Sequence, residues 1–216
     1  RTTEVLDAVT SVAVTTESVD VHVRYDDVAH PRVVERDLVE GGLSYRTEGG
    51  KLVVEHTGQQ AWRWIAWKQL TIVLPRSMEA DTPDVSLRAT TASLEVDGSF
   101  GTVDAQAQTG SIEVDGRFQS FTGRTTNGSI DVRGGATDVS AETSTGSVDI
   151  VLDGTPPRSV DARTATGSVD ITVPDGTYAV DARPGMGSSD IEVAQDPSSP
   201  HRITAQTGTG SIDVTN

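Results

Sequence analysis

The chain has 216 residues and a formal net charge of −15, from 32 acidic and 17 basic side chains. This balance argues against a nucleic-acid-binding protein, because such proteins neutralise phosphates with Lys and Arg, and against adsorption to anionic lipid. The sequence has no cysteine, which excludes disulfides and thiolate chemistry, and no run of about 18 apolar residues that would predict a transmembrane helix.

The first part of the chain, residues 1–84, predicts β-strands in an irregular arrangement. Valines alternate with polar residues from residue 11 to residue 25, which is the period of a half-buried strand. A hairpin is predicted over residues 43–55 around Gly49-Gly50, and a strand over residues 70–74 that Pro75 ends. We expect residues 1–84 to form a β cap in the same domain as the remaining residues, because repeat stacks need atypical end units that shield the core.

All three tryptophans fall in one short segment of this first part. The segment contains Trp62, Arg63, Trp64, Trp67 and Lys68. Aromatic rings beside cations can form a binding surface for a glycan, a protein or a membrane interface. Alternatively, the large rings cap the open end of a core built from small residues. We prefer the cap, because the segment leads directly into the strand predicted at residues 70–74.

The second part, residues 85–216, repeats one phrase: a small turn residue, then Ser, an aliphatic residue, an acid and a second aliphatic residue. The repeated Ser stands at residues 93, 111, 129, 147, 168, 188 and 211, so one unit takes about 18–23 residues. Aliphatic or small residues alternate with polar ones on both sides of the Ser, so each unit holds two short strands with a turn between them. A weaker copy of the phrase at residues 16–21 predicts an eighth unit at the N-terminal end of the array.

We therefore expect an all-β fold, in which the two-strand units form a β-solenoid-like stack of the parallel β-helix type. One unit cannot bury its own apolar face, whereas stacked units share a continuous core. The alternative is a meander of hairpins, for which the Asn127-Gly128 turn is the best local evidence.

In a parallel stack, the acid of each unit would lie about 4.8 Å from the acid of the next unit. This candidate acid ladder contains Glu95, Glu113, Asp131, Asp149, Asp170, Asp190 and Asp213. The ladder could attract divalent cations through its oxygens. Each unit offers one carboxylate, however, whereas Ca²⁺ takes six to eight oxygen ligands, so we interpret the ladder as a solvated face and predict no metal site.

A second outward column is predicted five residues before each Ser. It contains Arg88, Gln106, Arg124, Glu142, Arg163, Arg183 and Gln206. One interpretation is that this column pairs with the acids of another molecule and supports self-association. The other interpretation is ordinary surface charge, since exposed ion pairs contribute little.

No residue pattern predicts catalysis. The four histidines are scattered, and the motifs of metalloproteases, nucleophile elbows and phosphate loops are missing. The repeated Ser has no recurring His that could activate it. The many acids permit a carboxylate pair of the glycosidase type, but no pair stands out from the column. We predict no catalytic residue and no cofactor.

Several parts of the sequence resemble the bacterial "putative adhesin" family of β-strand repeats, the DUF4097 type. They are the Thr-Gly-Ser-Val-Asp-Ile phrase, the alternating stretch at residues 12–23 and the step from strand to proline at Leu74-Pro75. The resemblance covers nearly the whole chain. It implies a β-solenoid-like domain outside the cytoplasmic membrane, often behind an N-terminal anchor, and some relatives are tied to envelope-stress sensing. It implies no catalytic residues, and the tryptophan segment is not part of the family phrase.

The residues and the resemblance together predict a non-enzymatic, extracytoplasmic binding or structural module of the bacterial cell envelope. Its partner would be an envelope protein or a glycan, and a membrane anchor would precede Arg1. One alternative is an envelope-stress sensor that binds a protein. A less favoured alternative is a polysaccharide-active β-helix enzyme, because no site for one is recognisable.

Overall fold

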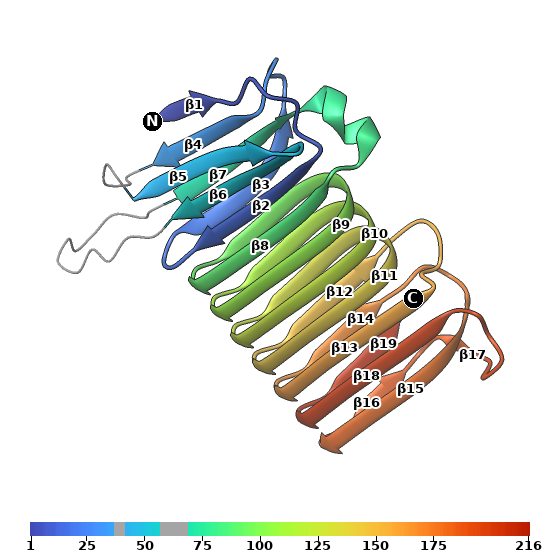
Figure 1. Cartoon of the computed structure of the whole chain (residues 1–216). Helices are drawn as coiled ribbons and strands as arrows, with labels where there is room; N and C mark the ends of the chain where they lie inside the picture. Colours follow the sequence, from blue (N-terminus) through green and yellow to red (C-terminus); the bar gives the residue numbers. More distant parts are fainter. Residues whose placement is uncertain (37–41, 57–68) are drawn as a thin grey trace.

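The computed structural model describes residues 1–36, 42–56 and 69–216 (Figure 1). In these residues the regular structure is almost entirely β-strand, in an open sheet, with one 3-10 helix, η1 (Arg76–Asp81). None of the described residues form a helix with the length and hydrophobicity needed to cross a bilayer. The predicted all-β class is therefore confirmed.

The strands before the helix are β1 (Thr2–Glu4), β2 (Ser11–Thr16), β3 (Asp20–Asp26), β4 (Arg32–Arg36), β5 (Leu43–Glu48), β6 (Lys51–His56) and β7 (Gln69–Pro75). The strands after it are β8 (Asp84–Thr91), β9 (Leu94–Thr109), β10 (Ile112–Asn127), β11 (Ile130–Thr145), β12 (Val148–Leu152), β13 (Ser159–Thr166), β14 (Val169–Thr172), β15 (Thr177–Met186), β16 (Ser189–Ile191), β17 (Ala194–Gln195), β18 (Arg202–Thr209) and β19 (Ile212–Thr215). The predicted hairpin is the antiparallel pair β5–β6, with Gly49 and Gly50 at positive φ in its turn. The predicted strand at residues 70–74 is β7, which ends at Pro75.

Equivalent strands of neighbouring units pair in parallel and form two layers (Figure 1). β10 pairs with β9 on one side and β11 on the other, so that equivalent positions of the repeat phrase face one another. The N-terminal half of β9 pairs with β3 in one layer and its C-terminal half with β8 in the other. Parallel neighbours exclude a hairpin meander for these units, because a hairpin joins antiparallel strands.

The core lies between the two layers and is built from the inward-facing residues of the repeat. In β11, the strand between Ser129 and Ser147, the side chains of Ile130, Val132, Val139 and Ala141 are all at most 2% exposed. Burial of a Val or Ile side chain stabilises the fold by about 1.5–3 kcal/mol. Each unit adds such residues to a continuous core, so the alternation in the sequence is also the source of the stability.

A column of buried threonines ties each unit to the turn of its neighbour. These threonines are 3–6% exposed, and each hydroxyl donates a hydrogen bond of 2.8–3.0 Å to the carbonyl oxygen of a turn glycine. The pairs are Thr125 with Gly110, Thr143 with Gly128, Thr164 with Gly146, and Thr207 with Gly167. The small side chain at this position therefore satisfies a backbone acceptor as well as filling space.

Replacing Thr143 with Val is expected to lower the free energy of unfolding by about 1–3 kcal/mol, because the isosteric side chain leaves the Gly128 carbonyl without its donor. Urea denaturation followed by circular dichroism measures the change. The matched control is Thr126→Val. Thr126 directly follows the buried Thr125, but its own side chain is exposed. Equal stability of the two variants would show that the buried hydrogen bond contributes nothing.

The order of units in the stack differs from their order in the chain at both ends. β18 lies between β13 and β15, and β19 lies between β14 and β16. Likewise, β2 lies between β6 and β8, and β3 lies between β7 and β9. The predicted eighth unit at residues 16–21 is present, because β2 and β3 pair in parallel with β8 and β9. It is not the last unit of the stack, however, since β6 and β7 lie beyond it.

Residues of the β15–β16 unit explain why this unit takes the end of the stack. Pro184 occupies the position of the buried threonines, opposite Thr207, and has no hydroxyl to donate to a turn glycine. Ser189 stands opposite the core residue Ile212 and would be a poor replacement for it inside the stack. Pro is tolerated on an edge strand, because no further strand needs its missing N–H.

The phrase at residues 16–21 places Ser18 at the position of the repeated Ser, and this register is wrong by two residues. Val21 rather than Val19 pairs with Leu94, so that Asp20 takes the position of the repeated Ser. The Asp20 carboxylate accepts a hydrogen bond of 2.8 Å from the Ser93 N–H. The reason is that Thr16 occupies the buried-threonine position and donates its hydroxyl to the Val19 carbonyl at 3.0 Å, which fixes where the turn falls.

Candidate functional site

The structure places all seven predicted acids side by side on the outer face of one layer. Their spatial order is Glu95, Glu113, Asp131, Asp149, Asp170, Asp213 and Asp190. His22 occupies the next position beyond Glu95, because of the two-residue difference in register. The acid ladder is thus a continuous row of carboxylates that ends at an imidazole.

Two carboxylates of the acid ladder, Asp131 and Asp170, lie in surroundings that disfavour their charged form. Burial raises the pKa of Asp131 above its ordinary value. The guanidinium of Arg133, 3.7 Å away, acts against this increase, whereas Asp149 and Glu113 add to it. The row therefore carries electrostatic strain at neutral pH, as expected for like charges on adjacent strands.

Replacing Asp170 with Asn is expected to raise the melting temperature at neutral pH. Burial, together with Asp213 and Asp149, raises the pKa of Asp170 in the folded protein above its ordinary value of 3.8. Its charge therefore destabilises the fold above the folded pKa, and the penalty disappears as the pH falls toward 3.8. We expect the free energy of unfolding to increase by about 0.5 kcal/mol at neutral pH. The effect is small because the carboxylate is largely solvated.

Thermal denaturation of Asp170→Asn and the parent protein, at about pH 7 and about pH 3.5, checks this expectation. The control is Asp153→Asn, which removes an exposed acid outside the ladder. An increase in melting temperature that is the same at both pH values, or equal to that of the control, would contradict the role of the Asp170 charge.

One group of His and acid side chains in the described part of the chain could hold a cation. The ligand atoms of His22, Glu95 and Asp97 all lie within 4.8 Å of one another. The ring is already engaged within the protein, because Nε2 lies 2.6 Å from Asp97 Oδ2 and Nδ1 lies 3.7 Å from Glu95 Oε2. We interpret the group as an ion-pair cluster at the end of the acid ladder. The sequence prediction missed this group, because the register of the phrase at residues 16–21 would set Asp20 rather than His22 opposite Glu95.

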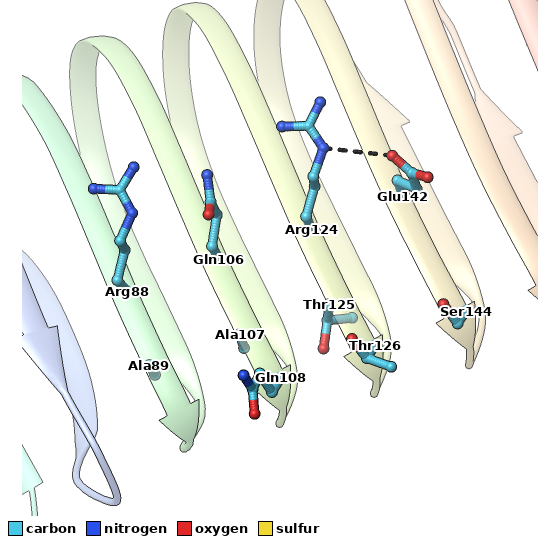
Figure 2. Close-up of a pocket in the computed structure, with 10 residues that line it drawn as sticks. All are labelled: Arg88, Ala89, Gln106, Ala107, Gln108, Arg124, Thr125, Thr126, Glu142 and Ser144. Atoms are coloured by element: carbon cyan, nitrogen blue, oxygen red, sulfur yellow. Dashed lines mark hydrogen bonds and ion pairs between the residues drawn. The ribbon is translucent and has the colours of Figure 1, made fainter.

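A shallow groove runs along the outer face of the other layer (Figure 2). Its ridge is the second predicted column, whose spatial order is Arg88, Gln106, Arg124, Glu142, Arg163, Gln206 and Arg183. Two depressions of about 390 Å³ and 480 Å³ follow one another beside this ridge and share Glu142 and Ser144. The first is also lined by Thr126 and the second by Ala165 and Gly208. Short side chains therefore accompany the ridge from Thr126 onward, whereas the longer Gln108 takes the equivalent position beside Gln106.

Each arginine of the ridge lies near a carboxylate but stays accessible. The pairs are Arg88 with Asp104 at 3.6 Å, Arg124 with Glu142 at 3.4 Å, Arg163 with Asp161 at 2.8 Å, and Arg183 with Asp181 at 2.6 Å. The four arginine side chains are 48–66% exposed. Since a guanidinium has five N–H donors, each can bind a further acceptor while keeping its ion pair. The groove is thus polar and close to neutral.

The predicted tryptophan surface lies outside the described residues. Trp62, Arg63, Trp64, Trp67 and Lys68 all fall within residues 57–68. Their roles as a cap or as a binding surface remain predictions.

No family model and no curated protein matches this chain. A solved structure from Bacteroides fragilis NCTC 9343, described as a "putative adhesin", aligns with a TM-score of 0.58 and 14% identity over 100% of this chain and 95% of that one. The two chains share a fold. A "putative cell adhesion protein" from Clostridium sporogenes aligns at 12% identity over 100% and 97% of the two chains, with a TM-score of 0.46. A "putative adhesin" from Parabacteroides distasonis aligns at 8% identity over 99% and 95%, with a TM-score of 0.48.

Proposed function

We propose that the chain is a non-enzymatic binding module of a bacterial cell surface, built as a flattened β-solenoid of the DUF4097 type. The observation that carries the proposal is the groove, where hydrogen-bonding side chains from seven units form one ridge beside a strip of short side chains. Such a surface suits a long repetitive ligand, since each unit adds a similar weak contact and the contacts combine. The shared fold with the Bacteroides fragilis structure supports an adhesin-like role by analogy alone.

The chemistry of the groove favours binding over catalysis. Its Arg, Gln, Thr and Ser side chains donate and accept hydrogen bonds but are poor general acids or bases near neutral pH. The one acid of the ridge, Glu142, is exposed and forms an ion pair with Arg124 at 3.4 Å, and no second acid of the ridge lies on an adjacent unit to act with it. We propose a glycan of the envelope as the ligand, reached from a position outside the cytoplasmic membrane, with an anchor preceding Arg1.

Sedimentation with washed bacterial cell-wall and membrane fractions tests the proposal. We expect saturable binding to the cell-wall fraction, reduced about ten-fold in the groove variant Arg88→Ala/Arg124→Ala. The control variant Arg117→Ala/Arg133→Ala removes the same charge from exposed residues outside the groove and should bind as the parent does. A parent protein that binds neither fraction, or a groove variant that binds like the control, would reject the proposed role of the groove.

The Trp62→Ala/Trp64→Ala/Trp67→Ala variant belongs in the same experiment. Lost binding at unchanged stability would make the tryptophan segment the recognition surface in place of the groove. Unchanged binding at reduced stability would support the cap.

A further inference from the structure

The ridge of the groove has a period of two units, which the order of the chain conceals. Along the sequence, Arg163 is followed by Arg183 and only then by Gln206. In the structure, β18 lies between β13 and β15, so Gln206 separates the two arginines. Arginine therefore occupies every second position over seven consecutive units, with Gln106, Glu142 and Gln206 between them.

This alternation fixes the distance between consecutive arginines of the ridge. Because parallel strands lie about 4.8 Å apart, consecutive arginines of the ridge are about 9.6 Å apart, and Arg88 is about 29 Å from Arg183. The ridge crosses the strands at right angles to their direction, so a ligand that follows it must lie along the stack. Figure 2 shows the first four side chains of the ridge, Arg88, Gln106, Arg124 and Glu142, in one row across their strands.

We propose that the groove binds a linear β-1,4-linked polysaccharide with a two-sugar repeat, extended along the stack. This inference rests on the proposed function and names the ligand class of the same groove. In such a polymer each sugar is turned over relative to the one before, and one disaccharide is about as long as two strand spacings. Every arginine of the ridge then meets the same edge of every second sugar.

The side chains match the chemistry of such a polymer. Sugar hydroxyls and acetamido groups both donate and accept hydrogen bonds. Arg offers donors only, in a planar fork. Gln106 and Gln206 offer both donors and an acceptor, and Glu142 offers acceptors, so donor-only positions alternate along the ridge with positions that can accept. The short side chains of Thr126 and Ser144 leave room for a sugar ring beside the ridge and add hydroxyl groups of their own.

Other extended ligands fit this surface less well. A peptide that adds to a sheet needs a free strand edge, whereas the groove crosses the face of paired strands. An amphipathic helix needs a groove lined by large apolar side chains, whereas the apolar residues of this one are only Ala, Gly and Pro, beside charged, amide and hydroxyl side chains. A nucleic acid needs cations without partners, but each arginine of the ridge lies within 3.6 Å of a carboxylate.

Isothermal titration with chito-oligosaccharides of two, four and six sugars tests the ligand class, together with peptide-free glycan strands from cell walls. Affinity should increase with each added disaccharide, because each one reaches another arginine of the ridge. Maltohexaose, whose α-1,4 linkage curves the chain, serves as the control and should bind at least about ten-fold more weakly than the β-linked hexasaccharide.

The decisive variant exchanges two neighbouring residues of the ridge, Gln106→Arg/Arg124→Gln. It keeps composition, charge and outward position but breaks the alternation, and we expect about ten-fold weaker binding of the chito-hexasaccharide. Circular dichroism and the melting temperature confirm that the variant is folded. Undiminished binding by the folded variant would overturn the role of the two-unit period.

The outcomes separate this inference from the proposed function. A parent protein that sediments with cell walls but binds neither chito-oligosaccharides nor free glycan strands would overturn the inference and leave the binding module intact. A parent protein that binds none of these materials would overturn both.

Discussion

Replacing Gly146 with Ala should lower the free energy of unfolding by about 3 kcal/mol or more. Gly146 has a φ of +139°, a conformation that residues with a Cβ rarely adopt. An added Cβ would lie 2.2 Å from the carbonyl oxygen of Gly128 in the neighbouring unit. The atom in the way belongs to the backbone, so the clash can be relieved only by moving a strand, which separates two paired units.

Chemical denaturation of Gly146→Ala measures this loss, and Gly135→Ala provides a matched control in the same region. At Gly135 an added Cβ would meet a flexible side-chain atom of Arg117 at 3.6 Å, which is an ordinary contact. We expect the control to change stability by less than about 0.5 kcal/mol. Similar losses in the two variants would mean that close stacking of the turn glycines does not limit the fold.

Removing residues 202–216 should destabilise the protein far more than the loss of an end unit. These residues form β18 and β19, which lie between two other units. The truncation removes the buried side chains of Ile203, Ile212 and Val214, worth roughly 5 kcal/mol or more. It also leaves β15 and β16 without their partners in the stack. The melting temperature should fall by about 10 °C or more, and limited proteolysis should cut within residues 177–191.

The comparison is an internal deletion of residues 177–198, which removes the unit at the true end of the stack. The deletion leaves residues 173–176 and 199–201 as the link, the same length as residues 152–158 between the equivalent positions of the preceding units. This deletion removes more residues than the truncation does. All remaining units nevertheless keep their present neighbours, except that β18 and β19 now form the edge of the stack. We expect this variant to melt at a higher temperature than the truncated one. The reverse order of stability would contradict the observed placement of β18.

The sequence determines the repeating part of the fold well, because its information is local and redundant. The alternation around each repeated Ser predicts two strands per unit, and the structure has them. The spatial proximity of the seven acids also follows from equal register, which each Gly–Ser turn sets in the same way. Asn127-Gly128 could suggest a hairpin, but the unit-to-unit spacing outweighs that single dipeptide.

The sequence does not reveal the order of the units, because similar phrases are interchangeable until tertiary contacts distinguish them. Pro184 and Ser189 mark the end unit, but an imperfect repeat can equally be a tolerated variation. The position of His22 was missed for a related reason. Residues 16–21 match the phrase in one register, whereas the buried hydroxyl of Thr16 fixes another.

A second column of glycines could have been found from the sequence. Gly98, Gly116 and Gly134 each follow an aliphatic residue and a charged one, and all three have positive φ in the middle of their strands. An added Cβ at Gly116 would lie 1.9 Å from the Gly98 carbonyl oxygen, so only glycine fits where these strands pass from one layer to the other. These glycines are 18 residues apart, which is the spacing of the repeated Ser in the same units, and this spacing indicates a second repeated position.

During synthesis, β15 leaves the ribosome before β18 and meets the open edge of β13 first. Val180 and Ala182 of β15 resemble Ile203 and Ala205 of β18, so β15 can occupy the place that β18 takes in the final structure. In that case β15 must detach from β13 before β18 can pair there and folding can finish. Thr207 favours the replacement of β15 by β18, because its hydroxyl donates a hydrogen bond of 2.8 Å to the Gly167 carbonyl oxygen. Pro184 of β15 has no hydroxyl and would leave that oxygen without this donor. We therefore expect the slowest step of folding to be a competition between two near-identical strands for one edge.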